Sequence, residues 1–143
     1  MNAAPELLMV DDDQGHVELI RRNLRRAGFT NVIATMDNGE AALDYVFRRG
    51  AYADRPDRPG LMILMDLKMP GRIDGSEALR QLKADPTTKA IPVIMLTTTD
   101  DPREVSRCYE LGCNVYVTKP VDPASFSDVL RKLGQFITVM RTP

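Results

Sequence analysis

Residues 7–13 read Leu-Leu-Met-Val-Asp-Asp-Asp, four apolar residues followed at once by three aspartates. A short apolar run that ends in polar residues is typical of a strand buried on both faces of a parallel sheet. An amphipathic helical pattern follows, and Gly28 suits its end. The apolar positions of that pattern recur at spacings of three and four: Val17, Ile20, Leu24 and Ala27. The stretch therefore predicts a strand that ends in carboxylates and leads into a helix.

The same alternation continues along the chain. Further strands are predicted at 32–34, 61–65, 93–96 and 115–117. Further helices are predicted around 41–46, 78–82 and 102–111 and from 122–123 onward. Five strands alternating with helices favour a single α/β domain over residues 1–143, with a parallel sheet covered by helices on both faces. Residues 48–60 hold two Pro, two Gly and four Arg and are expected to form a long surface loop.

Composition excludes several classes of protein. The 143 residues are 43% hydrophobic and 27% charged, with a net charge of −1, which excludes a disordered chain and a strongly basic nucleic-acid binder. No apolar run approaches the roughly 18 residues of a membrane span, and no signal peptide is visible. Cys108 and Cys113 do not suggest a disulfide scaffold, so we expect a cytoplasmic protein. A single histidine, His16, excludes a histidine-rich metal site and is expected at the surface or as a capping residue.

Polar side chains follow four of the five predicted strands, at the end of the sheet where open parallel sheets bind ligands. They are Asp11 to Asp13, Asp66, Thr97 and Lys119. Each alone is typical of a helix cap, a turn or a solvated surface, but four together at four strand ends favour a site. Clustered carboxylates repel one another and recruit a hard cation such as Mg²⁺, which leaves room for a phosphate. With a lysine and a hydroxyl, this set predicts phosphoryl transfer.

The chain resembles the receiver domains of two-component response regulators, from about Leu7 to about Leu133. The segments that carry the resemblance are 7–13, Leu64-Met65-Asp66-Leu67-Lys68-Met69-Pro70, Asp74-Gly75, Val93-Ile94-Met95-Leu96-Thr97 and Val115-Tyr116-Val117-Thr118-Lys119-Pro120. The resemblance implies a five-stranded parallel sheet in the order 2-1-3-4-5. It also implies a phosphoacceptor signalling protein, not an enzyme in the usual sense.

The resemblance implies a role for each matching residue. Asp66 would take the phosphoryl group from a sensor histidine kinase. Asp11, Asp12 and Asp66, with the backbone carbonyl of Lys68, would hold Mg²⁺. Lys119 would pair with a phosphoryl oxygen.

Three further residues complete the pattern that the resemblance implies. Thr97 supplies a hydroxyl that moves toward the phosphoryl group, and Tyr116 is the aromatic residue that switches with it. Pro120 follows the lysine, and in this family the bond before it is typically cis.

Two departures from the family pattern stand beside the acceptor aspartate. Gly71, Arg72 and Ile73 make the loop one residue longer than is common in receivers, so we expect a reshaped loop. Lys68 and Thr99 occupy positions at which the family tunes dephosphorylation. A lysine at 68 that reaches the phosphoryl group or an acid would obstruct attacking water, which predicts slow autodephosphorylation.

The long 48–60 loop and the extended last helix are similar to stand-alone receivers associated with bacterial and cyanobacterial phytochrome kinases, which implies such a kinase as partner. With no output domain expected, the signal would leave through the face formed by the predicted helix at 102–111, the strand at 115–117 and the helix from 122–123 onward. A heptad-like stripe runs along the last helix: Phe126, Leu130, Leu133, Ile137 and Met140. The stripe fits the sheet, but Ile137 and Met140 lie beyond the usual domain end and suggest packing on a second subunit. A homodimer through this face and the C-terminal extension follows as a hypothesis.

The first predicted helix, which contains Val17 to Ala27, carries arginines at 21, 22, 25 and 26. They fit a solvated face or a docking site for the kinase.

Three other classes of protein fit parts of the sequence. A haloacid-dehalogenase-like phosphatase would use Asp11 and Asp13 as its Asp-x-Asp motif and would find an acidic pair in Asp100 and Asp101, but it leaves the Asp66 segment unexplained. A flavodoxin-like cofactor binder is disfavoured because three aspartates would repel a flavin phosphate. A receiver that only binds partners is disfavoured because all the key residues are present.

Overall fold

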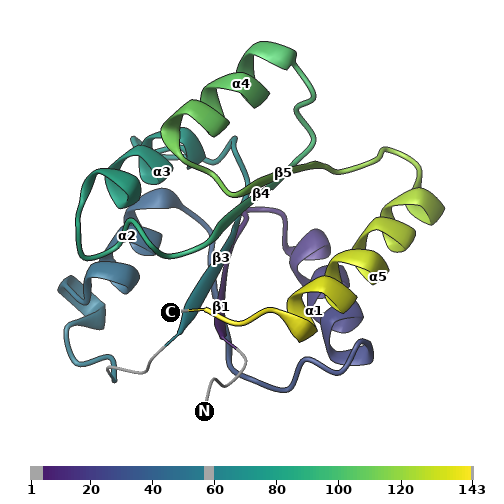
Figure 1. Cartoon of the computed structure of the whole chain (residues 1–143), viewed down its shortest axis with the longest axis horizontal. Coiled ribbons are helices and arrows are strands. Elements are labelled where there is room, and N and C mark those ends of the chain that lie inside the picture. Colours follow the sequence, from purple (N-terminus) through teal and green to yellow (C-terminus); the bar gives the residue numbers. More distant parts are fainter. Residues whose placement is uncertain (1–4, 57–59, 143) are drawn as a thin grey trace.

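The computed structural model describes residues 5–56 and 60–142. Within these ranges it forms one five-stranded parallel sheet in the order β2-β1-β3-β4-β5 (Figure 1). The strands are β1 (Glu6–Val10), β2 (Ile33–Met36), β3 (Leu61–Met65), β4 (Val93–Thr97) and β5 (Val115–Thr118). Both the fold class and the strand order expected from the sequence are confirmed.

Helices cover both faces of the sheet. They are α1 (Gln14–Arg26), α2 (Gly39–Phe47), α3 (Gly75–Ala84), α4 (Pro102–Leu111) and α5 (Pro123–Val139). In Figure 1, α1 and α5 lie together on one face, and α2, α3 and α4 lie on the other. None of the described helices is long and apolar enough to cross a membrane.

The sheet separates two apolar cores because successive side chains of a strand point to opposite faces. Leu7 and Met9 of β1 pack with α1 and α5, and Leu8 and Val10 pack with the other three helices. All four side chains are at most 1% exposed. The apolar run that the sequence begins with is therefore buried on both sides, as expected of a central parallel strand.

Aspartate or asparagine begins each described α-helix. In every case the side chain accepts a hydrogen bond from a backbone N–H of the first turn, which satisfies one of the free donors there. The capping residues are Asp13, Asn38, Asp74, Asp101 and Asp122. These caps lie in the loops that follow the strands, so each α-helix begins on the side of the sheet where its preceding strand ends.

The apolar stripe of α5 packs within its own chain. Phe126, Leu130, Leu133 and Ile137 are buried in the core shared with α1, and Met140 packs against the same cluster. Ile137 is fully buried. Ile137 therefore packs within its own chain and not on a second subunit, whereas Met140 is only half-buried and its packing on a second subunit stays a prediction.

Ile137 is buried because α1 and α5 approach each other closely, so the core between them continues to the end of α5. A side chain on Gly134 would lie only 3.1 Å from the Cβ of Ala27 in the residues after α1.

The 48–60 stretch contains a short 3₁₀ helix at Gly50–Tyr52, and residues 57–59 lie outside the described structure. Arg55 stacks over the Tyr45 ring at 4.4 Å and donates to the Tyr45 carbonyl oxygen at 2.8 Å. Tyr52 packs edge-on against Tyr45 at 5.3 Å. This part of the expected loop is thus held against α2 by its own aromatic and arginine side chains.

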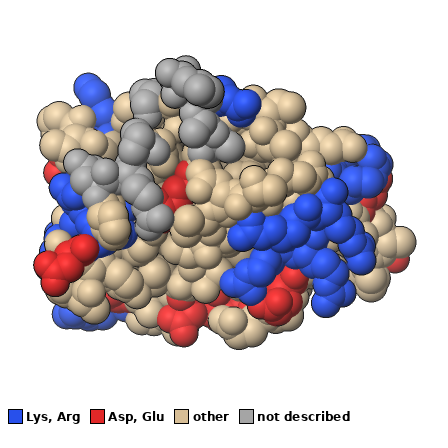
Figure 2. All heavy atoms as spheres, turned by 90° about the horizontal axis from the view of Figure 1, so that it is seen from below, with Lys and Arg blue, Asp and Glu red and all other residues tan. Residues whose placement is uncertain are grey.

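The arginines of α1 lie along the helix and away from the carboxylates at its start. Arg22, Arg25 and Arg26 are exposed, and Arg25 donates to two backbone carbonyl oxygens of the following loop. Figure 2 shows the molecule from below, where Lys and Arg side chains gather over one side. Twelve residues of helix separate Asp13 from Arg25, about 18 Å. Arg25 and Arg26 therefore lie at the end of α1 that is far from the carboxylates.

Candidate functional site at the carboxyl ends of the strands

The ends of β1, β3 and β5 bring three of the predicted side chains together, Asp11, Asp66 and Lys119. Thr97, at the end of β4, adjoins them through its backbone carbonyl oxygen, which accepts from the Lys119 N–H. One oxygen from each of Asp11, Asp12 and Asp66 lies within 4.8 Å of the others. Asp11 is buried, Asp66 is half-buried and Asp12 is exposed. Three carboxylates at this separation form an all-oxygen site that fits a hard divalent cation.

Lys119 is the centre of the site. Its side chain is 1% exposed, and its ammonium donates to Asp11 Oδ2 at 2.6 Å and to Asp66 Oδ2 at 3.3 Å. A third contact, at 3.0 Å, joins Lys119 Nζ to Nδ1 of His16. A buried ammonium needs such partners, because an unpaired charge inside a protein is costly.

Burial and hydrogen bonding act on the pKa of Asp11 in opposite directions. Burial raises the pKa of this carboxyl above its ordinary value, and the hydrogen bonds from Lys119 and from the Asp13 backbone N–H oppose that shift. The Asp13 N–H donates to Asp11 Oδ1 at 2.9 Å. A buried carboxylate whose charge is only partly compensated is a strong ligand for a cation.

Thr97 and Tyr116 meet at the backbone of Thr99. The buried Thr97 hydroxyl oxygen lies 3.5 Å from the Thr99 backbone N–H, and the Tyr116 hydroxyl donates to the Thr99 carbonyl oxygen at 2.6 Å. Burial raises the pKa of Tyr116 to about 12. The two predicted switch residues are thus linked through one residue of the loop that follows β4.

Close packing beside Asp66 explains the Asp-Gly pair at 74 and 75. A Cβ on Gly75 would lie 2.1 Å from the Asp66 carbonyl oxygen. The Gly75 N–H donates to the Leu67 carbonyl oxygen at 2.8 Å, and the Leu67 N–H donates to Asp66 Oδ1 at 2.7 Å. Only glycine fits here, and it lets α3 begin directly against Asp66.

The longer loop at Gly71 to Ile73 is seated on the start of α2. Glu40 Oε1 accepts from the backbone N–H of Arg72 at 2.8 Å and of Ile73 at 2.9 Å. Hydrogen bonds from its own backbone N–H and from these two residues lower the pKa of Glu40. Gly39 allows this contact, because a Cβ there would lie 2.4 Å from the Ile73 carbonyl oxygen.

A cavity of about 540 Å³ opens over the carboxylates. Its lining includes Lys68, which is exposed, together with Asp12, Asp13, Gln14, His16, Asp66, Thr98 and Lys119. His16 was expected at the surface or in a cap, and its contact with the buried lysine was not predicted. The sequence did offer one indication of this contact: His16 lies in the first turn of the helix that follows the aspartates at the end of β1.

The bond before Pro120 differs from the sequence expectation. No peptide bond in the described residues is cis, so Lys119 and Pro120 are joined by a trans bond. The expectation of a cis bond is therefore wrong. A trans bond is the lower-energy form for X–Pro by about 0.5–1 kcal/mol, and the Lys119 N–H still reaches the Thr97 carbonyl oxygen at 2.6 Å.

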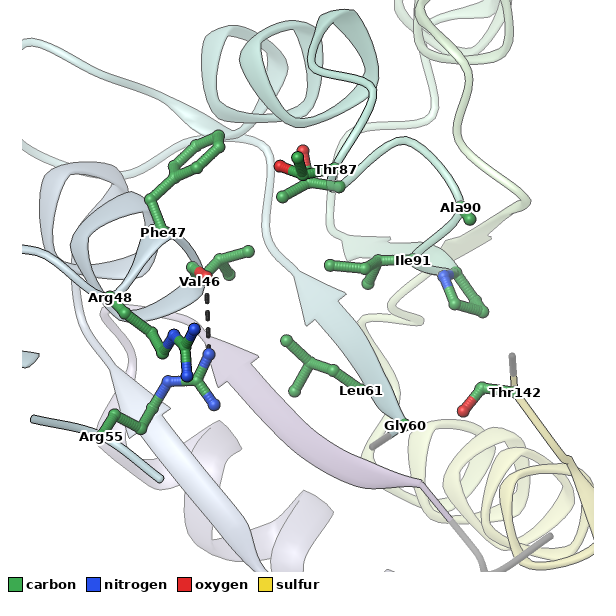
Figure 3. Close-up of a pocket in the computed structure, with 12 residues that line it drawn as sticks. Val46, Phe47, Arg48, Arg55, Gly60, Leu61, Thr87, Ala90, Ile91 and Thr142 are labelled. Carbon is green, nitrogen blue, oxygen red and sulfur yellow. Dashed lines mark hydrogen bonds between the residues drawn. The ribbon is translucent and has the colours of Figure 1, made fainter. Parts of the chain in front are cut away.

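A second cavity of about 540 Å³ lies at the other end of the sheet (Figure 3). It is lined by the end of α2, by the start of β3, by the loop before β4 and by two single residues: Val46, Phe47, Arg48, Arg55, Gly60, Leu61, Thr87, Thr88, Ala90, Ile91, Pro92 and Thr142. Arg55 Nη2 donates to the Val46 carbonyl oxygen at 3.4 Å across its edge. This cavity adjoins the amino end of β3, whereas Asp66 follows the carboxyl end, so it is separate from the carboxylate site.

The fold and the site define a class: a doubly wound α/β protein with an acidic, lysine-centred site at the carboxyl end of its sheet. The family model of the response regulator receiver domain matches residues 7–131. The chain belongs to the response regulator receiver family.

Similar proteins come from several organisms. The probable methanogenesis regulatory protein FilR2 of Methanothrix harundinacea is 38% identical over 90% of this chain and 79% of its own length. The crystal structure of a response regulator receiver domain from Rhodospirillum rubrum is 42% identical, with a TM-score of 0.87, over 96% of each chain.

Two cyanobacterial response regulators are also similar in structure. The phosphorylated cyanobacterial phytochrome response regulator RcpA is 28% identical, with a TM-score of 0.86, and the Mn²⁺-bound form of Rcp1 is 26% identical, with a TM-score of 0.88. Each alignment covers 97% of this chain and 99% of the other. The chain is therefore homologous to phytochrome response regulators.

Proposed function

We propose that this receiver accepts a phosphoryl group on Asp66 from a sensor histidine kinase, with Mg²⁺ held at the same site. The observation that carries the proposal is the shared ammonium of Lys119, which contacts Asp66 and Asp11 at once. A lysine held between the acceptor and a second carboxylate is placed to contact a phosphoryl oxygen as soon as one arrives.

Magnesium would be held by Asp11, Asp12 and Asp66, with the backbone carbonyl of Lys68 as a further oxygen ligand. The fit rests on the donor set, which is all oxygen and includes a carboxylate whose pKa is raised by burial. When bound, the cation neutralises charge on the acceptor and on the incoming phosphoryl group. The similar protein Rcp1 has a Mn²⁺-bound form, which supports a divalent cation as a ligand of this receiver.

The transfer needs little from the protein beyond position and charge. A carboxylate oxygen of Asp66 attacks phosphorus, the bond between that oxygen and phosphorus forms, and the bond from phosphorus to the kinase histidine breaks. The electron pair of the broken bond stays on the imidazole nitrogen. Lys119 offsets the negative charge at the acceptor.

The partner that we propose is a phytochrome-type histidine kinase. The support is the similarity to RcpA, a phosphorylated cyanobacterial phytochrome response regulator, over nearly the whole chain. The exposed arginines of α1 are a candidate docking surface for that kinase.

The output would leave through α4, β5 and α5. Its support is the contact of Tyr116, on β5, with the loop that precedes α4. A homodimer through this face and the C-terminal segment remains a prediction, and exposed apolar side chains there are Tyr109, Val121, Phe136 and Val139. Light scattering at micromolar concentration, with and without phosphorylation, tests it, and a monomeric mass in both states would count against it.

The proposed phosphorylation is tested by intact mass after incubation with acetyl phosphate. We expect one added phosphoryl group that requires Mg²⁺, is labile to alkali and is lost in Asp66→Asn. An adduct that survives Asp66→Asn but is lost in Asp11→Asn would favour a phosphatase-like enzyme instead. No adduct on the wild-type chain would contradict acceptance from a small phosphodonor.

A further inference from the structure

The contact between Lys119 and His16 has no place in the function described so far. His16 is the third residue of α1, and its side chain is 31% exposed, at the edge of the cavity over the carboxylates. Its Nδ1 lies 3.0 Å from Lys119 Nζ. An ammonium has three N–H donors and no acceptor, so the contact is favourable only when Nδ1 carries a lone pair. The ring hydrogen then sits on Nε2.

The number of partners at the ammonium matches its number of donors. Lys119 meets Asp11 Oδ2 from the end of β1, Asp66 Oδ2 from the end of β3 and His16 Nδ1 from α1. Three acceptors from three different elements direct all three N–H groups. Two of them, Asp11 and His16, do not carry the phosphoryl group.

A second contact competes for the same imidazole nitrogen. Asp13 Oδ2 lies 3.4 Å from His16 Nδ1, and it can be bonded there only if Nδ1 carries a hydrogen. Asp13 already accepts the backbone N–H of His16 through Oδ1 at 3.1 Å, as the cap of α1. Nδ1 of His16 is closer to Lys119 Nζ, at 3.0 Å, than to Asp13 Oδ2, at 3.4 Å, so the geometry favours the bond to Lys119. That bond does not disturb the cap, which uses Asp13 Oδ1.

The imidazole is held in this orientation by α5. The rings of His16 and Phe126 meet edge to face, with centroids 5.1 Å apart and planes at 80°. Phe126 is buried, so it cannot move aside without disturbing the core. The His16 ring is therefore fixed on one side by its own helix start and on the other by α5.

From these contacts we infer that His16 is a positioning residue: it accepts a hydrogen bond from Lys119 and aims the ammonium at the acceptor oxygen of Asp66. The inference deepens the proposed function and rests on it for its consequence. When a phosphoryl oxygen takes the place of Asp66 Oδ2, His16 and Asp11 still direct the other two N–H groups. Without His16, one N–H of a buried ammonium has no fixed partner, and the ammonium is no longer held in its orientation toward Asp66.

The contact itself is tested without phosphorylation. His16 is the single histidine of the chain, so nitrogen NMR of histidine-labelled protein reports this ring alone. At a pH where the imidazole is neutral we expect the Nε2–H form, with an Nδ1 signal that moves in Lys119→Met. An Nδ1–H form, or an Nδ1 signal unchanged by Lys119→Met, would overturn the inference.

The positioning role is tested by two substitutions at the same site. In His16→Asn the amide oxygen replaces Nδ1 as acceptor, whereas His16→Leu keeps bulk and removes the acceptor. We expect the initial rate of phosphorylation by acetyl phosphate to fall about tenfold in His16→Leu and to stay within about twofold of wild type in His16→Asn. A simple packing role would slow both variants alike, and that result, or an unchanged His16→Leu, refutes the positioning role.

The proposed function and the positioning role of His16 can be refuted independently of each other. A wild-type chain that takes no phosphoryl group from acetyl phosphate contradicts acceptance from a small phosphodonor, and the NMR experiment still decides whether His16 holds Lys119. A wild-type chain that is phosphorylated at the same rate as His16→Leu leaves the proposed function standing and overturns the inference.

Discussion

Replacing Lys119 by Met removes the buried ammonium and keeps a side chain of similar length. We expect this change to lower the free energy of unfolding by about 3 kcal/mol, because removing one partner of a buried ion pair costs about 3–5 kcal/mol. The side chains of Lys119 and Asp11 are 1% and 5% exposed, so water does not replace the lost contact.

An upper limit comes from the alternative open to Asp11, which is to take up a proton. For an aspartate with an unperturbed pKa near 3.9, staying neutral at pH 7 costs about 4 kcal/mol, at about 1.36 kcal/mol per pH unit. Loss of Lys119 removes an influence that lowers the pKa of Asp11, so that pKa rises further. The destabilisation should therefore shrink as the pH falls from 7 toward 5.

Denaturant unfolding followed by circular dichroism measures this effect in a chain without tryptophan. Lys68→Met is the matched control, since Lys68 lines the same cavity but is exposed, and it should change stability by less than about 0.5 kcal/mol. In an Asp11→Asn background, Lys119→Met should cost much less. A loss below about 1 kcal/mol in the wild-type background, or the same loss with and without Asp11, would refute this reasoning.

Three further predictions concern α5, Tyr116 and Lys68. Ile137→Ala should lower the free energy of unfolding by about 2–5 kcal/mol, whereas Phe136→Ala, at an exposed position, should change it by less than about 0.5 kcal/mol. Equal losses for the two variants in urea unfolding would contradict the packing of α5 described above. The phenol of Tyr116 should titrate with a pKa of about 12, read as the ultraviolet difference between wild type and Tyr116→Phe; its contribution to stability is present below pH 10 and lost as the pH rises through 12. Lys68→Ala should shorten the half-life of phosphorylated Asp66 by opening the cavity to water, and an unchanged half-life would remove that idea.

The central strands and the site edge were predictable because they follow from simple patterns. Leu7 to Val10 are apolar at every position, which only a strand buried on both faces requires. Parallel strands share one carboxyl edge, so Asp11, Asp66 and Lys119 had to meet there. The edge strand β2 was less clear: it was expected at 32–34 and lies at Ile33–Met36, because its residues are only half-buried or exposed.

Other features depend on packing that a single sequence does not display. The stripe on α5 has the same spacing whether it meets its own sheet or a second subunit, and the close approach at Gly134 decides between them. The contact of His16 with Lys119 joins residues 103 positions apart and needs Phe126 to hold the ring. The trans bond before Pro120 went against an expectation that came from the family resemblance alone.

The claim that Asp66 is the phosphoryl acceptor is tested most directly by locating the modified residue. After incubation with acetyl phosphate and Mg²⁺, borohydride reduces an aspartyl phosphate to homoserine, and peptide mass spectrometry then finds its position. We predict homoserine at position 66 in the wild-type chain and none when Mg²⁺ is omitted. Homoserine at position 11 or 12, or a reduced residue at 66 that forms equally without Mg²⁺, would contradict the account.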